Sequence, residues 1–444
     1  MLRRTYSILA AALLAAFSLP AFAQSGEYSS YSPYSIFGVG NLPHSYSAYN
    51  YSMGGVGVAS RNHRYLNTMN PAAVAVRDSL ALMIDFSVFN TNTIYRQTYD
   101  GNSYKSANNN TNIGGFAVSF PIWNKLAMVI GMRPYSSIGY NFAMKETDPH
   151  VIAANGNIEY SGAGEGSLYN IFGGLSLAPG KRFSIGAEAE YIFGKVEKNY
   201  AQNFVSTGYN EVRDDYTLTL NAFTGKFGVQ YEQPVGKDFS LTFGATYQLA
   251  ARVGGFNEYS RYSSGSVQNI IINSYSDTLR KVSPAIYLAG ELGVGIAFEV
   301  KGKFRGEFDY LRSDWTRSGM DSAKGFCASG APQSFATSVR ESYRMGFEYV
   351  PNLNDVRYYG KRIAYRAGAY YNKDYFTVAG NTVNSAGITL GATLPVFRWY
   401  NGVTVMVDIG QRGPFKGDLV RENYFRVGVG ANLFDIWFQK PRYN

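Results

Sequence analysis

The chain has 444 residues, of which 45% are hydrophobic, 16% aromatic and only 16% charged. This apolar content excludes a disordered chain, and no apolar run past residue 23 is long enough for a membrane-spanning helix. A single cysteine, Cys327, excludes a disulfide framework and a cysteine-rich metal site. The formal charge of +9 comes from scattered basic side chains rather than from a block, so nucleic acid is not an expected partner.

The first residues predict a cleavable export signal. Arg3 and Arg4 form a basic start, Ile8–Leu19 is an apolar stretch of signal-peptide length, and a small-residue cleavage site ends at Ala23. We therefore assign residues 1–23 to the signal peptide and expect an exported protein.

The mature chain divides into two parts and a tail. Residues 24–77 are rich in Ser, Tyr and Gly and have little regular period. Residues 78–438 are dominated by alternation of apolar with small or polar side chains, which is typical of half-buried strands. Residues 439–444 form a short C-terminal tail. We expect 24–77 to fold inside the structure that 78–438 builds.

The length and spacing of the alternating segments predict a transmembrane antiparallel β-barrel. Many segments exceed the 9–11 residues that a tilted strand needs to cross a bilayer. Short turns, such as 233–238 and 300–303, alternate with longer polar loops, such as 256–278 and 318–335. This alternation is typical of outer-membrane barrels, and the count is about 14 strands. We predict an all-β barrel in lipid of the outer membrane of a Gram-negative bacterium, with an N-terminal luminal plug; the alternative is a large soluble all-β protein.

Taking the apolar face as outward places a mixed set of charged side chains inside the barrel. A basic side chain facing lipid would cost about 2–4 kcal/mol at the midplane, whereas inside it can pair across strands. Two interpretations stay open, a salt-bridged and plugged lumen or a polar permeation path. The predicted luminal charges are Glu188, Glu190, Arg252, Glu291, Arg305, Glu307, Asp309, Arg344, Glu348, Arg366 and Asp408.

Several stretches carry a resemblance to a known family. They are Tyr34–Leu42, Ser52–Ala59, the Asn67–Ala72 stretch with its Asn-Pro-Ala element, Gly166–Gly174 and Asn423–Val427. With these stretches the chain resembles the FadL/OmpP1/TodX family of outer-membrane transport proteins, in the form common among Bacteroidota. The resemblance spans the mature chain and implies a 14-stranded barrel closed by an N-terminal hatch, in which hydrophobic compounds bind and leave sideways through a kink in the third strand.

The third predicted strand contains a proline, which independently agrees with such a kink. A proline cannot donate to a strand ladder, so within a sheet it marks an edge or a bulge. A bulge without any transport role is the alternative. The candidate ligand-binding and exit residues are Asn70, Pro71, Ala72, Gly131, Arg133, Pro134, Tyr135 and Ser136.

No pattern in the sequence predicts catalysis, a metal site or a cofactor. The three histidines lack metal-ligand spacing, so we predict a protein that is not an enzyme. The leading hypothesis is passive uptake of hydrophobic or amphipathic small molecules through a plugged lumen with a lateral opening. The alternative is an outer-membrane interaction protein, either a secretion shuttle or an assembly-associated barrel, which binds a protein partner in the outer membrane without transport.

Overall fold

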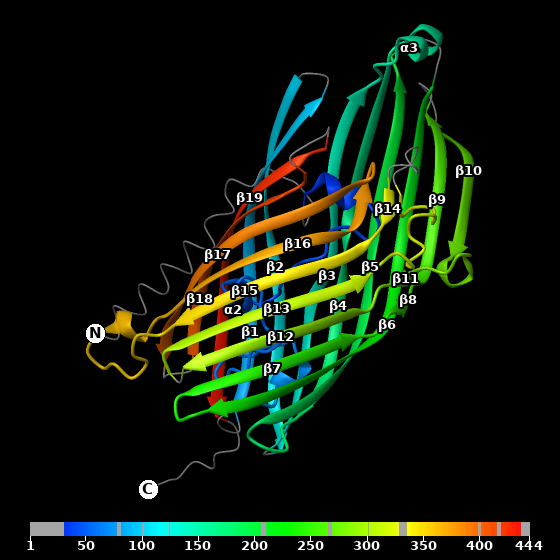
Figure 1. Ribbon diagram of the computed structural model, residues 1–444. Helices are drawn as coiled ribbons and strands as arrows, with labels where there is room; N and C mark the ends of the chain where they lie inside the picture. The colour runs from blue at the N-terminus through cyan, green and yellow to red at the C-terminus, as the bar shows by residue number, and fades with distance from the viewer. Residues whose placement is uncertain are drawn as a thin grey trace.

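The computed structural model contains one closed antiparallel barrel of 14 strands (Figure 1). The structure describes residues 31–77, 81–99, 102–123, 125–205, 210–264, 269–300, 302–327, 335–397, 401–414 and 419–436. The predicted signal peptide 1–23, residues 24–30 and the tail 439–444 lie outside these ranges. The strand count predicted from the sequence is confirmed.

Most wall strands are continuous. They are β1 (Ala81–Tyr99), β2 (Asn102–Trp123), β3 (Leu126–Lys145), β4 (Ile158–Leu177), β5 (Phe183–Phe204), β6 (Glu211–Val235), β13 (Phe304–Asp314), β16 (Ala364–Val378), β17 (Asn381–Phe397), β18 (Asn401–Arg412) and β19 (Arg421–Ile436). Another wall strand combines the short β14 (Phe335–Thr337) with β15 (Val339–Tyr349). Two short helices lie between wall strands, α3 (Pro149–Asn155) and the 3-10 turn η6 (Tyr359–Arg362).

Two wall strands are interrupted. The first is built from β7 (Phe239–Gln248), β8 (Ala251–Arg252) and β9 (Gly254–Ser264), and the second from β10 (Asn269–Thr278), the turn η4 (Leu279–Lys281), β11 (Tyr287–Leu288) and β12 (Glu291–Val300). β6 pairs with both β7 and β9, so the pieces continue one another. The stretch 256–278, expected to be a polar loop, is instead largely strand, because its two parts pair with each other as the antiparallel strands β9 and β10.

The alternation seen in the sequence sets the two faces of the wall. On β13, Phe308 is 47% exposed on the outer face, whereas Arg305, Glu307 and Asp309 are buried on the inner face. Such period-two burial follows from the pleat of a strand. Among the described residues, no helix combines the length and the apolar character needed to cross a bilayer.

The barrel closes where its first strand meets its last. β1 and β19 pair from Ala81↔Ile436 to Arg96↔Arg421. Inside this seam, the buried carboxylate of Asp85 accepts hydrogen bonds from Ser47 Oγ (3.0 Å) and from Asn432 Nδ2 (2.7 Å). One carboxylate therefore links both seam strands to the N-terminal segment.

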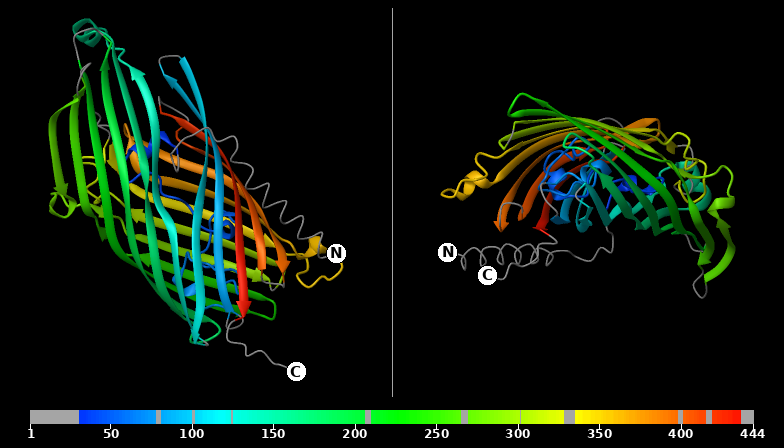
Figure 2. Two further views of the ribbon diagram at one scale, coloured as in Figure 1. Left: turned by 180° about the vertical axis from the view of Figure 1, so that it is seen from behind. Right: turned by 90° about the horizontal axis from the view of Figure 1, so that it is seen from below.

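The N-terminal segment, residues 31–77, runs within the ring of strands (Figure 2). It contains only short turns of helix, η2 (Pro33–Ile36), α2 (Ala48–Tyr51) and η3 (Pro71–Ala73). Its first part packs in an apolar cluster, where the ring of Phe37 lies 5.2 Å from that of Phe335 and 5.5 Å from that of Phe376. Gly38 N–H also donates to Phe326 O (2.8 Å), on the stretch that follows β13.

Candidate ligand site at the split between β2 and β3

The wall is split between its second and third strands. β2 and β3 pair from Trp123↔Leu126 up to Phe116↔Met132. Beyond that point β2 continues with β1, whereas β3 continues with β4 as far as Lys145. The two strands thus pair only over Phe116–Trp123 and Leu126–Met132, next to their connecting turn, and the hairpin β1–β2 diverges from β3 in Figure 1.

Local sequence on both strands explains the split. On β2, the register against β1 shifts between Ser87 and Val88, which leaves Gly114 as an extra residue. A Cβ on Gly114 would lie 2.7 Å from Tyr46 O, so only glycine allows this close approach to the N-terminal segment. On β3, Pro134 has no N–H to donate, and a bulge follows it at Tyr135.

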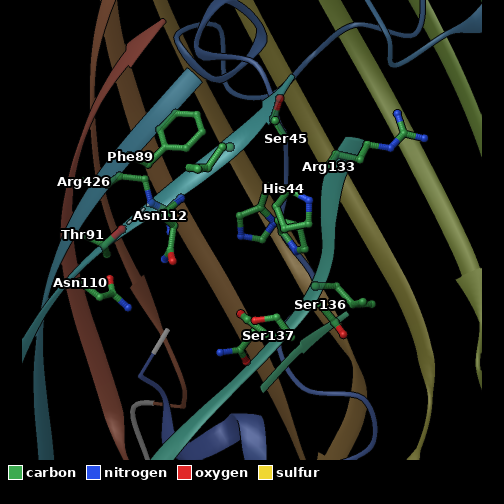
Figure 3. A pocket seen from close by; sticks show the side chains of 18 of the residues that line it. His44, Ser45, Phe89, Thr91, Asn110, Asn112, Arg133, Ser136, Ser137 and Arg426 are labelled. Carbon is green, nitrogen blue, oxygen red and sulfur yellow. Dashed lines mark hydrogen bonds between the residues drawn. The ribbon is translucent and has the colours of Figure 1, made fainter. Parts of the chain in front are cut away.

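A cavity of about 650 Å³ lies at the split (Figure 3). Its outer lining includes Phe116 and Met132, whose side chains are exposed on the outside of the wall. Its inner lining includes Arg412 and Glu422, which lie within the barrel. The cavity is therefore bordered by residues of both faces, at a point where the strand ladder is interrupted.

The cavity also has polar groups available for a ligand. Ser45 Oγ, Ser136 Oγ and His44 Nδ1 are buried and make no hydrogen bond to a described residue. Burial, with Arg344 as the largest charged contributor, lowers the pKa of His44 well below its usual value, so the imidazole is neutral at pH 7. Neutral donors and acceptors beside apolar side chains suit an amphipathic molecule.

Arg133, beside the proline, anchors the edge of the cavity. Its Nη2 donates to Glu190 Oε1 (2.7 Å) and its Nη1 to Thr68 O (3.3 Å). The guanidinium lies 4.4 Å from the centroid of the Phe172 ring. Arg133 therefore connects β3 to β5, across the intervening β4, and to the N-terminal segment.

The structure brings together only part of the predicted exit site. Arg133, Pro134 and Ser136 line the cavity. Tyr135 packs against the apolar cluster at the bulge, and Gly131 lies in the part of β3 that pairs with β2.

The Asn-Pro-Ala element lies elsewhere. Asn70 Nδ2 donates to Val58 O (2.7 Å) and to Val229 O on β6 (3.3 Å). Ala72 accepts from Ser176 on β4, and a Cβ on Gly186 of β5 would collide with Pro71. These three residues therefore pack against β4–β6 and do not line the cavity.

Four of the predicted luminal charges bind the backbone of the N-terminal segment. Asp309 Oδ2 accepts from Gly57 N (2.7 Å) and Val58 N (2.9 Å), and Arg344 Nη1 donates to Gly55 O (2.8 Å). The others in contact with backbone groups of this segment are Glu307, which accepts from Ala59 N, and Arg305, which donates to Arg61 O.

Further charges pair with one another. Arg366 contacts Glu348 at 2.7 Å, Asp408 contacts Arg426 at 3.4 Å and Glu291 contacts Arg340 at 3.3 Å. Glu188 is also buried, 3.8 Å from Arg133.

Arg252 is a correction, because its side chain is exposed rather than luminal. The alternation changes phase at the break between β7 and β8, where Leu249 and Ala250 are both exposed and Ala251 then turns inward. The neighbour across the strand pair, Tyr287, is exposed as well. A period carried through the break thus assigned Arg252 to the wrong face.

Sequence reasoning also missed part of the cavity lining. His44 and Ser45 lie in a segment without periodicity, so no signal marked them. Gly114 and Gly115 did carry one, because paired glycines within an alternating strand favour a bulge or a close backbone approach.

Solved structures of similar fold are, by their titles, a hydrocarbon channel and toluene transporters. The CymD monoaromatic hydrocarbon channel matches with TM-score 0.58 and 14% identity, covering 87% of this chain and 97% of that one. The Ralstonia pickettii toluene transporter TbuX gives 0.54 and 13%, covering 88% and 98%. The Pseudomonas putida toluene transporter TodX gives 0.55 and 13%, covering 90% and 100%. At this identity the likeness establishes the fold.

A comparison with curated protein sequences found no match. The family comparison, by contrast, covers the whole chain: the model described as BamG matches residues 1–444. The chain therefore belongs to the BamG family.

Proposed function

We propose that the protein is an outer-membrane channel for passive uptake of hydrophobic or amphipathic small molecules, which pass through the wall at the split between β2 and β3. The observation that carries this proposal is the cavity of about 650 Å³ at the split, bordered by Phe116 and Met132 on the outer face and by Arg412 and Glu422 within the barrel. An apolar molecule entering from lipid would meet the apolar lining first.

In this proposal the N-terminal segment is the plug. Buried carboxylates and guanidinium groups of the wall bind its backbone and hold it inside the barrel. Held there, it closes the direct route along the barrel axis. A lateral path then reaches the lumen beside His44 and Ser45 without displacing that segment. Polar groups along the path would orient the polar end of an amphipathic molecule.

The proposal is tested by filling the cavity. Asn112 lines it from β2, and Asn112→Trp adds a large side chain there. Asn108 has the same parity on the same strand but lies outside the lining, so Asn108→Trp is the matched control. In proteoliposomes, influx of the hydrophobic probe N-phenyl-1-naphthylamine should fall at least about tenfold for Asn112→Trp and stay at the wild-type rate for Asn108→Trp. Wild-type influx through a folded Asn112→Trp barrel would reject the lateral path.

A second candidate function is binding of another outer-membrane protein without transport. It is favoured by the use of luminal charges: Asp309, Glu307 and Arg344 are all bonded to the backbone of the N-terminal segment rather than arranged along an open passage. Purification in mild detergent distinguishes the two functions. A stoichiometric protein partner would support the second, and a small molecule retained in the cavity would support the first.

A further inference from the structure

A second hollow, of about 520 Å³, lies on the outer face of the wall where β7–β8 and β11–β12 are interrupted. Its depth comes from small residues at the two breaks, Ala250, Ala289 and Gly290. A Cβ on Gly290 would lie 2.7 Å from Gln248 O, so glycine keeps this place open. The hollow is separate from the cavity at the split, with which it shares no lining residue.

Cross-strand rows on the outer face show where the hollow lies relative to lipid. One row is apolar and follows the register Phe243–Ile296–Phe308–Met345. The next row toward the end of β13 follows Ala245–Val294–Tyr310–Tyr343–Tyr371, so it is aromatic on β13, β15 and β16. Tyrosine is typical of the boundary between hydrocarbon and headgroups. The hollow begins one row further, with Tyr247, Leu292 and Arg312.

Basic side chains gather at this height. Arg312 and Arg317 line the hollow, are exposed, and make no hydrogen bond or ion pair to a described residue. Arg252, the residue expected inside the barrel, is the cross-strand neighbour of Tyr287, which also lines the hollow. Arginine presents a planar fork of donors that matches phosphate oxygens, whereas isolated arginines facing hydrocarbon would be unfavourable.

The hollow also contains one acidic residue, Asp314. Its Oδ1 accepts from Thr316 N (3.0 Å) and from Thr316 Oγ1 (2.6 Å), which caps the turn after β13, and Arg312 and Arg317 also attract this carboxylate electrostatically. Glu341, the cross-strand neighbour of Arg312, is paired with Lys373 at 2.7 Å. The net charge of the hollow and its border is therefore positive, because Arg252, Arg312 and Arg317 outnumber Asp314.

We propose that this hollow binds the phosphorylated headgroup of a membrane lipid, with Arg312 and Arg317 contacting phosphate and Tyr247, Tyr287 and Leu292 contacting the upper part of the acyl region. The hollow lies just above the aromatic row, and a lipid of the surrounding leaflet has its phosphate at that height. A lipid is therefore the occupant that this position favours. This inference rests on the placement of the barrel in a bilayer and is independent of transport through the split.

Binding of lipid A to the purified full chain in detergent, followed by native mass spectrometry, tests the proposal. The double variant Arg312→Ala with Arg317→Ala should bind lipid A at least about tenfold more weakly, because two charge-assisted contacts are lost. The control, Lys181→Ala with Arg182→Ala, removes the same charge from exposed positions at the opposite end of the barrel and should bind as the wild type does.

Two further arms identify the ligand chemistry. Lipid A stripped of both phosphates should bind wild type as weakly as the double variant binds lipid A. Wild-type affinity in the double variant, with heat-modifiable migration intact, would overturn the site. Complete displacement of lipid A by millimolar inorganic phosphate would assign the hollow to a soluble anion and overturn the lipid proposal. Influx of the hydrophobic probe should be unchanged in the double variant, which separates this test from that of the split.

Discussion

The guanidinium of Arg133 on β3 and the carboxylate of Glu190 on β5 meet at 2.7 Å inside the barrel, across the intervening strand β4. Glu190 also accepts from Asn170 on β4 and from Gln248 on β7, each at 3.0 Å. This carboxylate therefore holds the third strand in the wall at the height where the second strand leaves it.

Removing that carboxylate should destabilise the barrel strongly. Glu190→Ala leaves the buried Arg133 with only the more distant carboxylate of Glu188, at 3.8 Å, which we expect to reduce the free energy of unfolding by about 3 kcal/mol. Urea unfolding in lipid vesicles, followed by tryptophan fluorescence, measures the change. Glu197→Ala on the same strand breaks an exposed pair with Lys195 and should cost less than about 1 kcal/mol. Equal effects of the two variants would contradict the role assigned to Glu190.

Asp309 should control the protection of the N-terminal segment. Asp309→Ala removes the acceptor of Gly57 N and Val58 N, and each hydrogen bond to a charged group contributes about 1.5–3 kcal/mol. Hydrogen exchange at these two amides should accelerate at least about tenfold. Asp215→Ala, which removes a partner of Arg213 on β6, is the control and should leave exchange at both amides unchanged.

The two unusual residues of the third strand should respond differently to valine. A Cβ on Gly131 would lie 2.5 Å from Phe172 Cζ and 2.6 Å from Phe116 O, so Gly131→Val should destabilise the barrel by about 1–3 kcal/mol through overpacking. Pro134→Val should be tolerated, because β-branched residues favour strands. The temperature at which the folded band disappears on a gel compares them. A Gly131→Val barrel as heat-resistant as the wild type would show that Phe172 can move aside.

Acidification should weaken the fold through His44. Its folded-state pKa lies well below the usual 6.5, so below pH 6.5 the unfolded chain binds more protons than the folded one and stability falls. For this one group the slope approaches about 1.4 kcal/mol per pH unit. His44→Gln should remove this slope, whereas His150→Gln, in the exposed α3, should retain it. Urea midpoints between pH 5 and 7 give the comparison.

Outer-membrane barrels have short periplasmic turns and longer extracellular loops, so the connections of this barrel predict which positions are reachable from outside the cell. In a Cys327→Ser background, Ser274→Cys on the exposed face of β10 should react with a membrane-impermeant maleimide on intact cells. Lys237→Cys, in the short turn between β6 and β7, should not react until the outer membrane is permeabilised. Labelling of Lys237→Cys alone on intact cells would reverse the orientation.

The wall was predictable because its signal is local. Each strand residue has a neighbour of opposite character, so Glu307 and Asp309 could be placed inside from β13 alone. The placement predicted for Arg252 was wrong because the alternation changes phase at two consecutive exposed residues, Leu249 and Ala250, and a period-two count does not detect such a change. Strands β9 and β10 were missed because their residues do not alternate in character: Ile270, Ile271 and Ile272 are consecutive and all exposed.

The site was less predictable because it depends on contacts that are distant in the sequence. Pro134 indicated the bulge on β3. The separation of β2 from β3, however, depends on the extra residue Gly114 of β2. The path of the N-terminal segment is set by acceptors such as Asp309, about 250 residues away from the amides that it binds. Asn70 was therefore expected at the opening but lies against β6.

The buried Asp85 at the seam has a consequence for the order of assembly. Its carboxylate needs a donor from Ser47, which is synthesised before the first strand, and one from Asn432, which belongs to the last strand. Closing the ring first would bury this charge with one of its donors missing, and the N-terminal residues would then have to be threaded into a finished cylinder. The favourable sequence is the reverse: the leading residues act as a core around which the sheet curls, and the last strand seals the cylinder once they are in place.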